Sequence, residues 1–131
     1  MEKSYSEIAK RFQNSYMSNS KWLKFFKVLG HQEIPAVFAE WKFINEERIF
    51  YYNLPRKGQF NEIMLLDGYF APIEFKWIQW IRIPKYPTQP HTNQKTKKIN
   101  DLEMIKKKIE DCGSSFNLQK EGSALILTAY S

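Results

Sequence analysis

Residues 73–83, with the sequence IEFKWIQWIRI, constrain the fold of this chain more than any other stretch. Large apolar side chains fill the odd positions of this stretch, apart from Gln79. The even positions are Glu74, Lys76, Ile78, Trp80 and Arg82. Because side chains along a strand alternate between the two faces of a sheet, the pattern predicts a strand over residues 69–83 that can bend at Pro72. Its odd face would line a core, and its even face would carry an indole among charges.

The length and composition of the chain indicate a single domain, residues 1–131. Hydrophobic residues make up 43% of the sequence and aromatic residues 16%, enough for one core and too many for a disordered chain. Its apolar runs are too short to cross a bilayer, and the N-terminal residues do not resemble a signal peptide. Cys112 is the single cysteine, in keeping with a reducing compartment. We therefore expect a cytoplasmic protein that does not bind membranes.

Two helices are predicted near the N-terminus. Ser4 and Glu7 have the spacing of a capping box, and apolar residues follow at helical intervals, which predicts a helix over residues 4–16. A break at residues 18–20 opens a second helix, and Gly30 ends it. The apolar stripe of this second helix consists of Trp22, Phe25, Phe26 and Leu29. A stripe at this spacing is expected to face the core.

From Pro35 onward the apolar pattern has a period of two, which is typical of strands. Residues 37–43 and 48–53 predict a hairpin, and residues 63–66 predict a third, short strand. Residues 84–99 then hold three prolines and no periodicity, so we expect a long loop rich in proline and lysine.

The C-terminal part predicts a helix followed by a hairpin. Asn100 and Glu103 have the spacing of a helix N-terminus, and Gly113 is expected to end that helix. A turn at residues 120–122 predicts the hairpin. The predicted fold class is α+β: a mostly antiparallel sheet of about five to six strands, with two N-terminal helices and one helix before a C-terminal hairpin.

Catalytic and metal-binding motifs are not recognisable in the sequence. His31 follows a helix-ending glycine, where an imidazole can bind the last carbonyls, and His91 lies in the polar loop with no fixed partner. A nuclease that uses both histidines would need the two rings at one phosphate, and nothing in the spacing supports this. Cys112 closes an amphipathic helix and is expected to be buried. No metal-ligand spacing or phosphate-binding glycine loop occurs, so we expect a non-enzymatic protein without metal or cofactor.

Two groups of residues are candidates for binding a partner. The first group follows the even face of residues 73–83 and its extension: Lys76, Ile78, Trp80, Arg82, Lys85 and Tyr86. Trp, Tyr and Arg dominate the energetics of protein interfaces, so this face fits a protein partner if helices cover only the other side of the sheet. If both sides are covered, Trp80 is part of the core.

The second group contains cations of the loop and of the helix after it: Lys95, Lys97, Lys98, Lys106, Lys107 and Lys108. The net charge of +6 favours acidic partners, nucleic acid among them. A lysine-rich loop beside a lysine-rich helix could follow a phosphate backbone. The alternative is that these lysines form a solvated helix face and a solvated loop with no binding role, since lysine is common on ordinary surfaces.

Part of the chain resembles the immunity proteins of bacterial toxin systems, those of colicins and of contact-dependent inhibition loci. The residues that carry the resemblance are the Trp-rich segment 77–84 (WIQWIRIP), the loop after it, residues 99–111 (INDLEMIKKKIED) and the closing strand 124–130 (ALILTAY). Residues 21–26 (KWLKFF) are also similar to the start of small uncharacterised bacterial proteins.

The resemblance implies a small inhibitor, without catalytic activity, that binds one cognate toxin in the producing bacterium and occludes its active site. The residues expected to anchor the toxin are Trp80, Arg82, Lys76 and Tyr86. Immunity proteins to nucleases are commonly acidic, whereas this chain is basic, which implies a toxin with an acidic surface or a local contact that net charge does not describe. The chain would act as a monomer or as a homodimer paired through the exposed sheet face.

Overall fold

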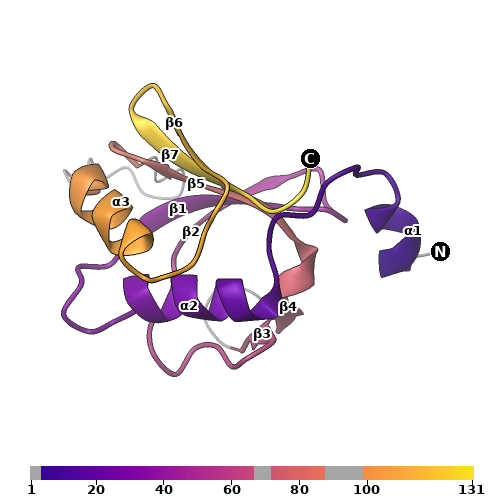
Figure 1. The fold of residues 1–131 in the computed structure, drawn as a ribbon, viewed down its shortest axis with the longest axis horizontal. Helices are drawn as coiled ribbons and strands as arrows, with labels where there is room; N and C mark the ends of the chain where they lie inside the picture. Colours follow the sequence, from indigo (N-terminus) through magenta and orange to yellow (C-terminus); the bar gives the residue numbers. More distant parts are fainter. Residues whose placement is uncertain (1–3, 67–71, 88–98) are drawn as a thin grey trace.

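A computed structural model describes residues 4–66, 72–87 and 99–131, and the fold is α+β, as predicted (Figure 1). The helices are α1 (Tyr5–Ala9), α2 (Asn19–Leu29), α3 (Leu102–Glu110) and the short 3-10 helix η1 (Phe75–Trp77). The strands are β1 (Phe38–Phe43), β2 (Ile49–Asn53), β3 (Met64–Leu65), β4 (Ile73–Glu74), β5 (Ile78–Pro84), β6 (Leu118–Glu121) and β7 (Ala124–Thr128). Five of them form an antiparallel sheet in the order β2-β1-β5-β7-β6, and β3 pairs with β4 in a second, two-stranded sheet. Both predicted hairpins are therefore confirmed.

The core lies between α2 and one face of the five-stranded sheet, which we call the inner face (Figure 1). Ser18 caps α2 by accepting a hydrogen bond from the Lys21 backbone N–H, and the predicted apolar stripe of the helix is buried. Phe26 is fully buried at the centre, with its ring centroid 5.3–5.9 Å from the rings of neighbours on α2, β1, η1 and the loop after β2. Opposite it, one row of paired residues crosses the inner face: Phe50, Trp41, Ile81, Leu127 and Leu118.

The first helix is shorter than predicted, because α1 ends at Ala9. Ser4 caps it as expected, accepting from the Glu7 backbone N–H. Beyond it, the backbone of residues 13–16 bonds to the C-terminal residues: the N–H of Tyr16 donates to the carbonyl of Ala129, and residues 13 and 14 donate to that of Ser131. These bonds replace the helical ones, so tertiary pairing overrides the local preference for helix.

Residues 73–83 do not form the single strand that the alternation predicted. η1 divides β4 from β5, and β4 pairs with β3 rather than with the main sheet. In the pairing of β1 with β5, Lys42 lies opposite Trp80 and Phe43 lies opposite Ile78, so that β5 carries one extra residue, Gln79. An extra residue of this kind is a β-bulge, and it shifts the alternation of faces along the strand.

Asn100 ties the start and the end of the predicted loop to the sheet. It is 4% exposed, and its side-chain amide donates to the carbonyls of Phe38 and Pro84 and accepts from the Phe38 N–H, at 2.7–3.1 Å. Its backbone N–H also donates to the carbonyl of Lys85. The predicted role of Asn100 as a helix cap is therefore wrong: Asp101 caps α3, accepting from the Met104 N–H. Of the predicted loop, residues 88–98 lie outside the described residues.

Replacing Asn100 should destabilise the protein strongly. Asn100→Ala leaves buried groups of Phe38 and Pro84 without partners, so we expect the free energy of unfolding to fall by about 3 kcal/mol. Asn53→Ala, at an exposed position of β2, is the control and should change it by about 0.5 kcal/mol or less. Urea denaturation followed by far-UV circular dichroism measures both. Equal values for the two variants would contradict the role given to Asn100.

Candidate protein-binding surface

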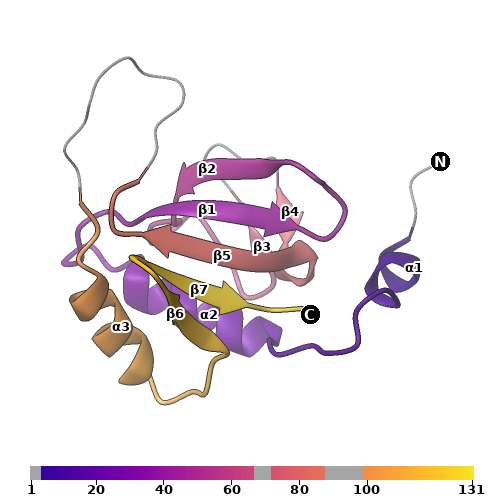
Figure 2. The same cartoon turned by 90° about the horizontal axis from the view of Figure 1, so that it is seen from above.

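The second face of the five-stranded sheet, which we call the outer face, points away from α2 (Figure 2). Residues paired directly across antiparallel strands share a face, so the register defines it. The outer face includes Tyr51 of β2, Phe38, Glu40 and Lys42 of β1, Trp80 and Arg82 of β5, Ile126 and Thr128 of β7, and Gln119 of β6. Within residues 4–66, 72–87 and 99–131, no helix lies over its centre, and α2 passes behind the sheet in Figure 2.

An ion pair lies at the centre of the outer face. The Nη1 atom of Arg82 is 2.9 Å from Oε2 of Glu40, directly opposite on β1. The Arg82 side chain is 35% exposed and that of Glu40 is 14% exposed, so the carboxylate is the more buried partner. The pair holds the guanidinium in place and sets a negative charge against its positive charge. This lowers the cost of removing the guanidinium from water when a partner docks.

Trp80 lies beside this pair and is partly exposed. Its cross-strand neighbours are Lys42 on β1 and Thr128 on β7. The Lys42 ammonium donates to the backbone carbonyls of Phe43 and Glu46, at the β1–β2 turn, rather than standing free over the sheet. Burial lowers the pKa of Lys42, and the nearby Arg11 charge lowers it further.

An exposed aromatic residue completes the surface. Tyr51 of β2 is 38% exposed and lies directly opposite Glu40. The outer face thus places Trp80, Tyr51 and a paired Arg82 on neighbouring strands. These residue types bury large areas with few rotatable bonds, which suits them to a protein interface.

The structure separates two residues of the predicted binding group, Ile78 and Lys76, from Trp80. Ile78 is fully buried, because the bulge at Gln79 turns it to the inner face, so its placement on a binding face was wrong. Lys76 belongs to η1, where its ammonium lies 4.5 Å from the centroid of the Tyr5 ring and 3.8 Å from the Glu74 carboxylate. Lys76 therefore contacts α1. Because it lies in η1 and not in β5, strand alternation does not place it on the same face as Trp80.

Lys85 and Tyr86 follow the end of β5 and are both exposed, Tyr86 by 63%. The Lys85 ammonium lies 5.4 Å from the centroid of the Tyr86 ring, and the Lys85 backbone N–H donates to the carbonyl of Ser123 in the β6–β7 turn. These two residues form an exposed cation–aromatic pair beyond the end of the central strand β5.

The lysines proposed for nucleic acid divide into two sets. Lys106, Lys107 and Lys108 are exposed on α3, and Lys106 lies 3.8 Å from the Glu110 carboxylate. The loop cations Lys95, Lys97 and Lys98 lie outside the described residues.

His31 and Cys112 follow the C-terminal ends of two different helices, α2 and α3. His31 is exposed, and its Nδ1 accepts from the Glu33 N–H rather than from the last carbonyls of α2. His91 lies outside the described residues. Cys112 is partly exposed, so the predicted burial of its thiol was wrong.

Two further observations concern residues 4–66, 72–87 and 99–131. They contain no helix with the length and apolar character to span a bilayer. They also contain no cluster of three or more histidine, cysteine, aspartate or glutamate side chains arranged to hold a metal ion.

A scan against protein-family models gives no match, nor do searches of curated proteins and of solved structures.

Strand alternation alone placed Glu40 and Lys42 together on one side of the predicted strand 37–43. The sequence did not indicate that Glu40 pairs with Arg82 or lies beside Tyr51, because these contacts depend on which strands are neighbours. No local signal marked the bulge at Gln79 that turns Ile78 inward.

Two tryptophan variants test whether Trp80 belongs to the surface. Trp41 is fully buried on the inner face, and its indole N–H donates to the carbonyl of Tyr52. We expect Trp41→Ala to lower the free energy of unfolding by about 3–5 kcal/mol, because it opens a large cavity. Trp80→Ala should lower it by about 1 kcal/mol. Chemical denaturation measures both, and a loss at Trp80 as large as that at Trp41 would place Trp80 in the core.

Proposed function

We propose that this protein is a non-enzymatic immunity protein, which binds a cognate bacterial toxin in the cytoplasm and neutralises it by occluding the toxin's active site. The observation that carries the proposal is the outer face, where Trp80 lies beside the Arg82–Glu40 pair with Tyr51 on the edge strand. The pattern resemblance of residues 77–84, 99–111 and 124–130 to toxin-immunity proteins supports the same function.

The charge of the outer face fits a protein partner better than the net charge of the chain suggests. Arg82 is paired with Glu40, and the Lys42 ammonium is bound to backbone carbonyls at the β1–β2 turn. The centre of the face therefore combines aromatic groups with an ion pair of no net charge, although the whole chain carries +6. The Lys42 charge lies at the β1–β2 turn instead. A contact centred on this face would not require a strongly acidic toxin.

The test is growth rescue. The proposal requires a toxin gene beside the gene for this chain, and the toxic domain of that gene is expressed in bacteria together with this protein or a variant. We expect the native chain to restore growth, and the double variant Trp80→Ala, Arg82→Ala to lose that protection. Lys24→Ala, on the exposed side of α2, is the control and should protect fully. Failure of the native chain to protect would contradict the proposal, and full protection by the folded double variant would move the site elsewhere.

Binding of the purified toxic domain gives a quantitative measure. Trp80→Ala should weaken the complex by about 2 kcal/mol, which corresponds to about 30-fold in Kd, as expected for an anchor at the centre of an interface. Isothermal titration calorimetry at fixed salt measures the change, with Lys24→Ala again as the control. A change smaller than threefold would show that Trp80 is not an anchor.

The alternative is a nucleic-acid-binding module, which the three exposed lysines of α3 favour. Binding through Lys106–Lys108 would weaken steeply as the salt concentration rises, because phosphate contacts release counterions. Gel retardation with RNA and with DNA at two salt concentrations tests it. The absence of salt-sensitive binding would remove this alternative without affecting the immunity proposal.

A further inference from the structure

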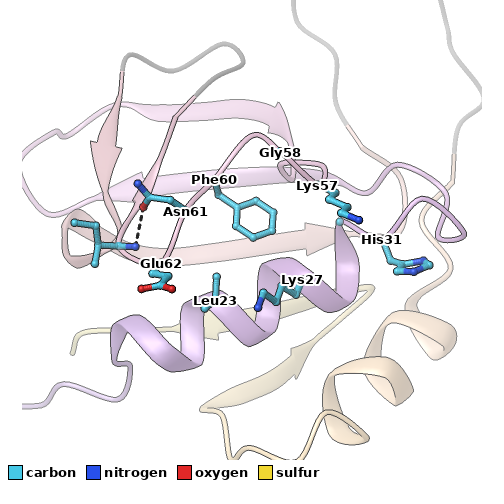
Figure 3. A pocket seen from close by; sticks show the side chains of 10 residues that line it. Leu23, Lys27, His31, Lys57, Gly58, Phe60, Asn61 and Glu62 are labelled. Carbon is cyan, nitrogen blue, oxygen red and sulfur yellow. Dashed lines mark hydrogen bonds between the residues drawn. The ribbon is translucent and has the colours of Figure 1, made fainter.

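A pocket of about 700 Å³ lies between α2 and the loop that follows β2 (Figure 3). Figure 1 shows α2 and this loop on the same side of the five-stranded sheet. The pocket that they line is therefore on the side opposite the outer face. Its walls include Leu23 and Lys27 of α2, His31 beyond the helix end, and Lys57, Phe60 and Ile63 of the loop. The volume is within the range of pockets that bind small organic molecules.

The apolar wall of the pocket is held in place by contacts to the core. The Phe60 ring, which stands between the loop and α2 in Figure 3, has its centroid 5.9 Å from that of the buried Phe26 ring. Next to it, the Asn61 side-chain oxygen accepts from the backbone N–H groups of Ile63 and Met64, at 2.9 Å each. The backbone N–H of Lys57 also donates a hydrogen bond to the Gly30 carbonyl, which attaches the loop to the end of α2. A wall fixed in this way needs little ordering when a ligand binds.

Gly30 permits this close approach between the loop and the helix end. A Cβ atom at this position would lie 2.5 Å from the Pro55 carbonyl oxygen and 2.6 Å from that of Phe26. The loop can therefore contact α2 here only because the residue has no side chain.

The polar groups of the pocket are arranged asymmetrically. In Figure 3, Lys57 and His31 lie toward one end, and Glu62 lies toward the other. Because the Nδ1 atom of His31 accepts from the Glu33 N–H at 3.2 Å, the neutral imidazole carries its proton on Nε2 and can donate there. Lys27 adds a second ammonium along α2. In Figure 3, Lys27 lies between the two ends, so the end with Lys57 and His31 offers the ammonium of Lys57 and the Nε2–H of His31 to an anion.

We propose that this pocket binds a small aromatic carboxylate. The aromatic body would lie against Phe60, Leu23 and the 47% exposed Ile63, and the carboxylate would point to the end with Lys57 and His31. Glu62 at the opposite end disfavours the reverse orientation, since it would meet the carboxylate with a like charge. The inference does not depend on the proposed immunity function, because the pocket and the outer face are on opposite sides of the sheet.

A matched pair of probes tests the proposal. The full isotopically labelled chain is titrated with naphthalene carboxylate and, separately, with the neutral naphthalenemethanol of the same ring position, and its amide resonances are followed by NMR. We expect saturable shifts at Leu23, Gly58 and Phe60, with tighter binding of the carboxylate. Lys57→Gln should weaken carboxylate binding by about three- to tenfold and leave the neutral probe unchanged. Ile63→Ser should weaken both probes.

Lys24→Gln is the matched control. It removes one positive charge from the same helix, but the Lys24 ammonium lies on another side of α2 and binds the Ser114 hydroxyl at 2.9 Å. It should bind both probes like the native chain, as should Trp80→Ala on the outer face. The proposal is overturned if the two probes bind equally well, if neither gives saturable shifts at the pocket, or if Lys24→Gln has the same effect as Lys57→Gln.

Discussion

The packing of α2 across the inner face of the sheet is the interaction on which the rest of this structure depends. Besides its neighbours on α2, Phe26 is in contact with rings from three other parts of the chain: Trp41 of β1, Phe60 of the loop after β2 and Phe75 of η1. Because these rings bury large apolar areas, the sheet directs its apolar side chains toward α2. The same packing holds the loop around Phe60 against the helix, and it leaves the outer face to residues of mixed polarity.

The character of the outer face is set by strand pairing. The bulge at Gln79 turns Ile78 into the core while Trp80 and Arg82 remain outside, although all three occupy even positions of one segment. The order of the strands then brings Glu40 opposite Arg82. A surface that mixes an indole with a paired guanidinium is the result of this register, and a shift by one residue would have buried the charges instead.

The two surfaces proposed for binding differ in shape and in chemical character. The outer face is broad and open, and its aromatic and paired polar groups suit another protein. The pocket beside α2 is concave, with an apolar wall formed by Phe60 and positive charge near Lys57, which suits a small anion. Since the sheet and α2 separate them, a protein on one side and a small molecule on the other would not compete for the same residues.

The sequence by itself determined those features that depend on local spacing: the apolar stripe of α2, both hairpins, the helix before the last hairpin and the α+β class. Only the tertiary structure decided features that depend on contacts between distant segments. The backbone of residues 13–16 pairs with the C-terminus instead of extending α1, and Asn100 bonds to Phe38 and Pro84 instead of capping α3. Local spacing reports which way a side chain tends to point relative to its neighbours along the chain. It carries no information on which strand will lie beside which. Hydrogen bonds between segments distant in the sequence therefore decide which locally predicted elements form and which do not.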